Sequence, residues 1–190
     1  MITATQSRSV PSPEAVLRGY LHAKDENRPL LLQDVFAEDA RLQVSNKAMN
    51  IAFPAFTHGR EAIADVLVRR FNQTYENIYS FYMARPPAEA TKFSCDWLVT
   101  MSEKDSRSVR VGCGRYEWEL QGSSPYLASQ LHVSIEVMLL LPSAKLEEVF
   151  AWVRLLSYPW SSAAESLKFA PSIESLAEVL QYLGRNASDA

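Results

Sequence analysis

The spacing of apolar residues predicts three helices in the first third of the chain. Ser12 is a candidate N-cap, and Pro13 fits the first helical position of a segment that runs to about Asn27. Apolar residues recur there every three or four positions, so one face of this helix should be buried. Pro29 restarts the chain as a second short helix, and Gly59 marks the turn into a third, which reaches about residue 71.

The middle of the chain alternates between apolar and polar residues, which is the period of a half-buried strand. The alternation predicts a short strand over 41–45 and longer strands over 77–83, 93–102, 108–120, 130–141 and 146–157. Polar, glycine or proline residues separate most of the longer strands, so neighbouring strands should pair as hairpins. Helices followed by such strands predict an α+β fold, with the helices on one face of a strongly curved, mostly antiparallel sheet.

The ends of the chain differ from this central part. Residues 13–158 should form the α+β domain, and residues 1–12, rich in serine, threonine and proline, are expected to be a disordered lead-in. Residues 159–190 should contain a linker and one further helix over about 173–183, which Ser172 caps and Gly184 closes. This C-terminal helix either caps the domain or packs on a partner.

The tight loop at 142–145 suggests that the last two predicted strands pair directly, which assigns their residues to two faces. One face is almost wholly apolar and carries Ile135, Phe150 and Trp152. An exposed apolar face of this size is rare on proteins in water. We therefore expect a homodimer that buries this face, the alternative being that the C-terminal helix covers it.

The opposite face of the same strands mixes small and polar residues. His132, Ser134 and Glu136 lie on it, and the register across the preceding loop adds two glycines, Gly112 and Gly114. Small residues on the concave side of a curved sheet leave room, and polar groups that point into that room need partners or a ligand. This face predicts a cavity, although bending of the strands alone would also explain the glycines.

Composition narrows the classes of partner. The net charge is −3 and no basic cluster stands out, so no nucleic-acid partner is expected. No apolar run approaches the ~20 residues of a membrane span, and the N-terminus lacks the apolar stretch of a signal peptide, so a cytoplasmic protein is expected. The two cysteines, Cys95 and Cys113, are interpreted as small buried residues. No metal-binding spacing or cofactor motif is present, and none is expected to be needed.

One stretch carries a resemblance to a known family. It contains the sequence F-A-E-D-A, which starts at Phe36, and the sequence H-G-R-E-A-I, which starts at His58. A helix that ends in F-A-E-D-A is expected there, followed by a short strand, an irregular loop and a new helix. This order resembles the nuclear-transport-factor-2-like superfamily, which includes ketosteroid isomerases and SnoaL-like domains. The resemblance covers roughly Pro13 to Pro159. It implies a cone-shaped barrel wrapped round three N-terminal helices, to which the C-terminal helix is an addition.

The resemblance also suggests roles for individual residues. Ketosteroid isomerases use a carboxylate base with an oxyanion hole made of a tyrosine and a protonated acid. Tyr20, in R-G-Y-L, matches the tyrosine, and Glu136, in S-I-E-V-M, matches the acid. The position of the base is occupied by Val44. Proton transfer of the isomerase kind is therefore not expected.

Three residues remain as further candidates for catalysis or for structural roles. Glu136 is either a hydrogen-bond donor to a ligand carbonyl or a buried residue held by tyrosine and histidine. His132 lies ~13 Å from Glu136 along the strand, too far for a direct bond but close enough for one ligand to touch both. Asp96 is a further candidate acid whose face the pattern leaves open. His58 is expected to cap or pack at the start of the third helix.

Aromatic residues suggest the character of the ligand. The irregular segment 46–56 is too apolar to lie free in water, so it should cover the mouth of a cavity or a partner subunit. The residues expected to line the cavity are Phe53, Phe56, Tyr82, Trp97, Tyr116, Trp118 and Ser134. Such a lining favours a small, flat, hydrophobic molecule that bears a carbonyl group.

Three functions remain open at this point. The first is a cofactor-free cyclase, isomerase or dehydratase, supported by Glu136 with Tyr20. The second is a non-catalytic small-molecule-binding protein, supported by the absence of a base at Val44. The third is a dimeric interaction or accessory module whose cavity is residual, supported by the apolar face around Trp152.

Overall fold

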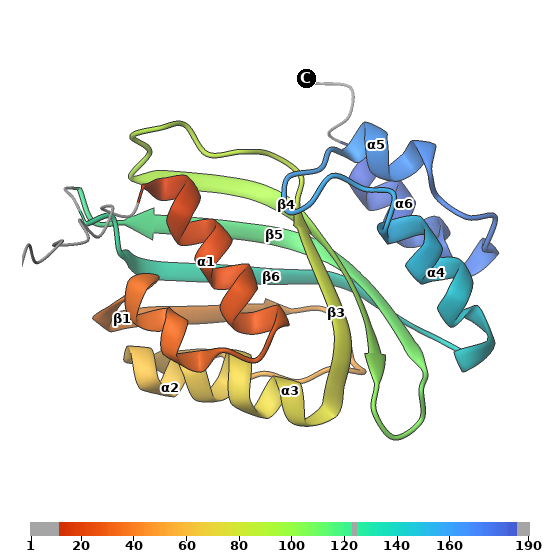
Figure 1. Ribbon diagram of the computed structural model, residues 1–190, viewed down its shortest axis with the longest axis horizontal. Helices are drawn as coiled ribbons and strands as arrows, with labels where there is room; N and C mark the ends of the chain where they lie inside the picture. The colour runs from red at the N-terminus through yellow and green to blue at the C-terminus, as the bar shows by residue number, and fades with distance from the viewer. Residues whose placement is uncertain (1–11, 123–124, 186–190) are drawn as a thin grey trace, which may run out of the picture.

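The computed structural model describes residues 12–122 and 125–185 of the chain, and it has an α+β architecture in three layers. A strongly curved sheet forms the middle layer (Figure 1). The N-terminal helices lie on its concave side, and the C-terminal helices lie on its convex side. The predicted fold class is therefore confirmed. The expected lead-in lies outside the described residues apart from Ser12.

The described residues form one six-stranded sheet in the order β2-β1-β6-β5-β4-β3. Its strands are β1 (Phe36–Asn46), β2 (Phe56–His58), β3 (Tyr75–Tyr82), β4 (Lys92–Glu103), β5 (Val109–Leu120) and β6 (Ala128–Leu141). All neighbouring strands are antiparallel except β1 and β6, which run parallel. The long strands that alternation predicted are thus present up to residue 141.

The N-terminal helices follow the predicted order. Helix α1 (Pro13–Asp25) begins at Ser12, whose hydroxyl accepts a hydrogen bond from the Ala15 amide, and a 3₁₀ turn follows over Pro29–Asp34. Helix α2 (Arg60–Ala64) continues through a wider π-helical turn, Asp65–Arg70, into α3 (Phe71–Thr74). The apolar faces of these helices and the concave side of the sheet enclose the larger of two hydrophobic cores.

The prediction of a strand over 146–157 is wrong, because this segment forms helix α4 (Leu146–Val153). The segment predicted as a linker contains a further helix, α5 (Ala163–Lys168), before a 3₁₀ turn and α6 (Ala177–Gly184). The expected C-terminal addition is therefore a layer of several helices. Figure 1 shows this layer beside the ends of the long strands, away from α1.

The sequence of α4 satisfies two periods at once. Val149, Phe150, Trp152 and Val153 are buried, as they would be on one side of a helix, while Ala151 is exposed. Two acidic residues stand in its first turn, where the positive end of the helix dipole favours them. Alternation alone could not separate this helix from a strand, because an apolar run this short fits both.

The predicted dimer face does not exist as one surface. Phe150 and Trp152 lie on α4 and pack in a second hydrophobic core, between the C-terminal helices and the convex side of β4–β6. Ile135 points to the other side of the sheet and belongs to the first core. The alternative, in which the C-terminal helix covers the apolar face, holds only for the convex part of the sheet, where α6 packs with α4 in the second core. Homodimerisation itself stays a prediction.

A β-bulge explains why the predicted strand faces were wrong. Cys113 pairs with Val137, but the next residue, Gly114, pairs with Ile135, so Glu136 is an extra residue in β6. Because the extra residue reverses the alternation, Ile135 and Met138 both face inward. A Cβ atom at Gly114 would collide with the Ser134 carbonyl oxygen, so glycine is required where the bulge brings the backbones together.

No helix in the described part of the chain is both long enough and apolar enough to cross a membrane.

Candidate functional site

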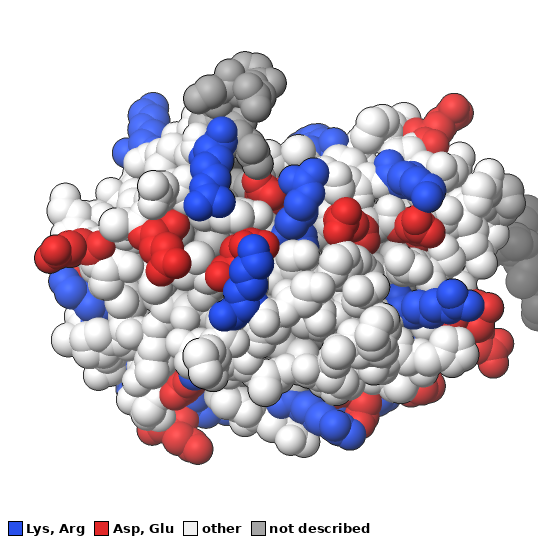
Figure 2. Space-filling view, turned by 180° about the vertical axis from the view of Figure 1, so that it is seen from behind, with Lys and Arg blue, Asp and Glu red and all other residues white. Residues whose placement is uncertain are grey.

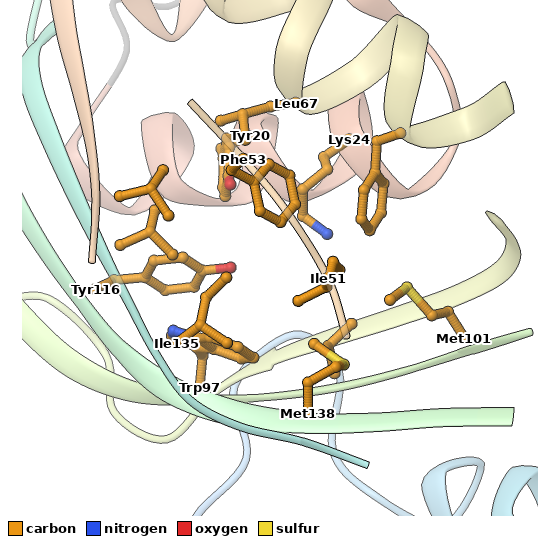
Figure 3. A pocket seen from close by; sticks show the side chains of 14 residues that line it. Tyr20, Lys24, Ile51, Phe53, Leu67, Trp97, Met101, Tyr116, Ile135 and Met138 are labelled. Carbon is orange, nitrogen blue, oxygen red and sulfur yellow. The ribbon is translucent and has the colours of Figure 1, made fainter. Parts of the chain in front are cut away.

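The inner core contains a cavity of about 50 Å³ between the helices and the concave side of the sheet (Figure 3). It is lined by Tyr20, Lys24, Val44, Ile51, Phe53, Leu67, Phe71, Trp97, Val99, Met101, Tyr116, Val133, Ile135 and Met138. Almost all of these side chains are apolar, and few polar atoms reach the space. The cavity thus suits an apolar molecule, whose position the polar atoms would fix.

Two tyrosines place hydroxyl groups in the lining. A hydrogen bond links the hydroxyls of Tyr20 and Tyr116, and their rings pack edge to face with centroids 5.9 Å apart. Burial raises the pKa of both hydroxyls well above the usual value of a tyrosine. Both groups are therefore neutral over the physiological range of pH, and because one hydroxyl donates to the other, one O–H of the pair is left for a ligand.

Lys24 brings a charge to the same cavity. Its side chain is only 7% exposed, and its Nζ donates to Asp25 Oδ1 at 2.5 Å and to Ser80 Oγ at 2.8 Å. The Asp25 carboxylate also accepts hydrogen bonds from the amide and the hydroxyl of Ser80. Nζ lies 5.2 Å from the centre of the Phe71 ring, which adds a cation–π contact. A buried lysine is tolerated here because its charge is paired and hydrogen-bonded.

Three residues separate the cavity from the surface. Ile51, Phe53 and Phe71 line both the cavity and an outer groove of about 250 Å³ that also contains Arg70 and Tyr75. Phe53 stacks on Phe71 with ring centroids 6.1 Å apart. Ile51 and Phe53 belong to the irregular segment between β1 and β2, so this segment covers the mouth of the cavity.

The predicted lining is partly recovered. Of the residues expected to line the cavity, Phe53, Trp97 and Tyr116 do so, and Tyr20, which was expected as a catalytic residue, lines it as well. The predicted residues that do not line it are Phe56, Tyr82, Trp118 and Ser134. Phe56 is 74% exposed on the edge strand β2, whereas Tyr82 and Trp118 are packed in the core. Ser134 lies opposite Arg115, on the outer side of the sheet.

Glu136 and His132 also lie outside the cavity. Glu136 forms an ion pair with the exposed Lys47, with Nζ and Oε2 2.5 Å apart. His132 Nε2 lies 2.8 Å from Ser45 Oγ, and its Nδ1 lies 2.7 Å from Glu117 Oε2. The expected inward face for these two residues is therefore wrong. They belong to the outer side of the sheet, where acidic and basic side chains are interspersed (Figure 2).

Asp96 is a third predicted acid on the outer side. It is buried, and Arg115 Nη1 lies 3.1 Å from its Oδ1. The hydroxyl of Tyr182, on α6, also donates to Oδ1 at 3.3 Å. Burial raises the pKa of Tyr182, and the nearby Asp96 raises it further. Asp96 thus joins the sheet to the C-terminal helices and does not face the cavity.

Sequence reasoning missed Lys24, although the signal was present. Leu17, Tyr20 and Leu21 define the buried stripe of α1, and Lys24 lies on that stripe, seven residues after Leu17 and four after Tyr20. A lysine at such a position either buries its alkyl stem and extends its charged end to water, or pairs that charge inside the protein. Val44, expected at the position of the missing base, does line the cavity.

The described residues offer no alternative chemistry from metals or thiols. Among residues 12–122 and 125–185, no three His, Cys, Asp or Glu side chains are grouped so that they could hold a metal ion. Cys95 and Cys113 are free and buried, and burial raises the pKa of each thiol to about 12. Their thiols are therefore protonated and unreactive at neutral pH.

Comparison with known proteins places the chain by its fold. No protein-family profile and no curated protein sequence matches it. A nuclear transport factor 2-like superfamily protein from Salmonella enterica serovar Typhimurium has a TM-score of 0.52 and 16% identity, over 65% of this chain and 88% of that one. A putative isomerase from Rhodopseudomonas palustris has a TM-score of 0.50 and 9% identity, over 73% and 94% of the two chains.

A third similar structure is a type 2 hexachlorocyclohexane dehydrochlorinase, with a TM-score of 0.50 and 15% identity over 66% of this chain and 84% of that one. Identities this low carry information about fold alone. The chain has the nuclear-transport-factor-2-like fold, which confirms the resemblance seen in the sequence at the level of architecture.

Proposed function

We propose that this chain is a small-molecule-binding domain that takes up a compact hydrophobic ligand in the cavity beneath Phe53. The observation that carries the proposal is an apolar cavity that the close-packed inner core leaves open beside a buried lysine. Protein interiors are usually filled, so a space of this size behind an aromatic pair favours an occupant. One of the similar structures is a hexachlorocyclohexane dehydrochlorinase, which is consistent with the proposal and does not carry it.

The size of the space suggests how binding would occur. A cavity of about 50 Å³ is smaller than a typical ligand site of roughly 300–1,000 Å³. A ligand larger than a few atoms would therefore displace Phe53 from Phe71 and extend into the outer groove. Phe53 lies on an irregular segment, which can move at a lower cost than a strand of the sheet.

Binding is better supported than the isomerase chemistry. Within the part of the chain that the structure describes, no carboxylate and no imidazole lines the cavity. Abstraction of a proton from a ligand needs such a base within hydrogen-bond reach. The interaction-module alternative is less favoured, because Trp118 packs on Phe36 and leaves the space beside Tyr116 open.

A cavity-filling substitution tests the proposal. The probe is α-methylstyrene, titrated into the purified chain and followed by saturation-transfer NMR. Val44→Phe would place a ring in the cavity, and Leu155→Phe is the matched control because Leu155 is 60% exposed on the other side of the molecule. Thermal unfolding of each variant establishes that it is folded.

The expected result is saturable binding to the wild type and to Leu155→Phe, with at least tenfold weaker binding to Val44→Phe. Equal binding to all three proteins would place the probe elsewhere and would reject this cavity as the site. An absence of saturable binding to the wild type would remove the proposed function.

A further inference from the structure

The lysine in the cavity has a hydrogen-bond donor to spare. An ammonium group carries three N–H donors, and two of those of Lys24 go to Asp25 and Ser80. In the close view of the cavity, the Lys24 nitrogen points into the space framed by Phe53, Ile51 and Tyr116 (Figure 3). Besides these two hydrogen bonds, Nζ makes a cation–π contact with Phe71, which lines the same cavity, so the third donor can reach a group inside the cavity.

A second donor in the lining lacks an acceptor. Trp97 is only 4% exposed, and its indole Nε1 is fully buried without a hydrogen-bond partner among the described residues. Buried donors in native proteins nearly always have an acceptor, but five other buried side-chain atoms of the described residues, among them Trp118 Nε1 and Trp160 Nε1, also lack a partner. The Trp97 nitrogen lies on the sheet side of its ring, away from the Lys24 nitrogen (Figure 3), so Lys24 is the donor that an acceptor group of a ligand would meet.

The charge of Lys24 is already balanced. Asp25 is as buried as Lys24, with 3% of its side chain exposed, and three donors from Lys24 and Ser80 hold its two carboxylate oxygens. Burial raises the pKa of Asp25, and the Lys24 charge and these hydrogen bonds oppose the shift by favouring the ionised form. A second carboxylate, brought by a ligand, would leave a net negative charge in a site with few polar atoms, which is costly.

We propose, on the basis of the ligand-binding function above, that Lys24 is the polar anchor of the cavity and that it donates a hydrogen bond to a neutral carbonyl oxygen. The ligand is thus a small apolar ketone, ester or related carbonyl compound, and an anionic carboxylate is disfavoured. Asp25 and Ser80 act as positioning residues, because they hold the ammonium group in place without touching the ligand.

Three probes of similar size separate these possibilities. Acetophenone carries a carbonyl oxygen, α-methylstyrene replaces that oxygen with a CH₂ group, and benzoate carries a carboxylate. Dissociation constants are measured by NMR titration for the wild type and for the double variant Lys24→Met/Asp25→Asn, which removes both charges together. The matched control is Lys47→Met/Glu136→Gln, which removes the ion pair on the outer side of the sheet.

The expected result is a change in selectivity. The preference for acetophenone over α-methylstyrene should fall about tenfold or more in the Lys24/Asp25 variant, since a hydrogen bond from a charged donor is lost. The same preference should be unchanged in the Lys47/Glu136 variant. In the wild type, benzoate should bind more weakly than acetophenone.

Two outcomes would overturn this inference while leaving the cavity as a ligand site. One is an unchanged preference in the Lys24/Asp25 variant, and the other is tighter binding of benzoate than of acetophenone to the wild type. The second comparison needs no variant, so it decides the matter even if the double variant does not fold. Failure of both α-methylstyrene and acetophenone to bind the wild type would instead reject the ligand cavity.

Discussion

Two lysine–carboxylate ion pairs in this protein have the same nitrogen–oxygen distance but opposite surroundings. Lys24 Nζ and Asp25 Oδ1 lie 2.5 Å apart on the concave side of the sheet, and 7% and 3% of the two side chains are exposed. Lys47 Nζ and Glu136 Oε2 are also 2.5 Å apart, but they lie on the outer side of the sheet, where 70% and 22% of the two side chains are exposed. The nitrogen–oxygen distance alone would predict that the two pairs contribute equally to stability. Burial separates them, because water screens an exposed pair and leaves a buried one to depend on its partners.

The comparison also separates structural from functional roles. The inner pair lies next to a cavity with unused donors, whereas the outer pair is one contact in a surface where charges of both signs are interspersed. A charged group that has been desolvated without an evident structural need is the stronger candidate for a role in binding. Three substitutions and one change of pH would break or sharpen this comparison.

The largest effect is expected from Lys24→Met. This change leaves Asp25 buried without its ionic partner, which should lower the free energy of unfolding by about 3–5 kcal/mol. Urea denaturation of the variant measures the loss. Adding Asp25→Asn should restore part of it, because the uncompensated charge is then removed. A loss below 1 kcal/mol for the single variant would mean that water reaches the pair.

Gly114→Ala should have the next largest effect. The added methyl group would collide with the Ser134 carbonyl and with the Trp97 ring, and overpacking typically costs about 1–3 kcal/mol. Here the backbone must also move, so the upper end of that range is expected in urea denaturation. Gly122→Ala is the control, because a Cβ atom there meets nothing. Equal stability of the two variants would argue against the close approach at the bulge.

A smaller effect is expected from the pH, because protonation of the Asp25 carboxyl should change the free energy of unfolding. Burial raises the pKa of Asp25 above its ordinary value, and Lys24 and Ser80 oppose the shift. The folded chain then takes up the proton at a higher pH than the unfolded chain does. The contribution of Asp25 to the free energy of unfolding therefore falls as the pH rises from the ordinary pKa of the unfolded chain through the raised pKa of the folded chain. Unfolding measured across this range should show that slope in the wild type and lack it in Asp25→Asn.

Lys47→Met should have the smallest effect. Exposed ion pairs typically contribute about 0–1 kcal/mol, so the change in unfolding free energy should stay within that range and shrink further in high salt. Probe binding in the cavity should be unaffected. A loss as large as that of Lys24→Met would contradict the contrast between the two sides of the sheet.

The sequence was sufficient for the elements whose pattern fits one period only. Helix α1, with its Ser12 cap, and the strands from β3 to β6 were predicted close to their observed ranges. The segment 146–157 was assigned wrongly because its apolar residues satisfy both the helical and the strand spacing. The two acidic residues that open α4 were the available signal for a helix.

The cavity lining was harder to predict because it depends on the bulge at Glu136. One extra residue reverses the faces of β6, so the alternation that placed His132 and Glu136 inside was correct in period and wrong in direction. Nothing in the local sequence fixes where such a bulge lies, apart from the glycine at position 114. The burial of Tyr20 was predicted from the helical period of α1 and is confirmed, whereas its catalytic role, which the family resemblance suggested, stays a prediction.

The most direct test of the ligand cavity uses the methionine methyl groups. Met101 and Met138 line the cavity, whereas Met49 is fully exposed and Met83 lies outside it. Methyl-labelled methionine NMR during a titration with acetophenone reports all of them in one experiment. We predict saturable shifts of the Met101 and Met138 signals, with Met49 and Met83 unchanged. Shifts confined to Met49, or saturable binding that leaves Met101 and Met138 unmoved, would contradict the assignment of this cavity as the ligand site.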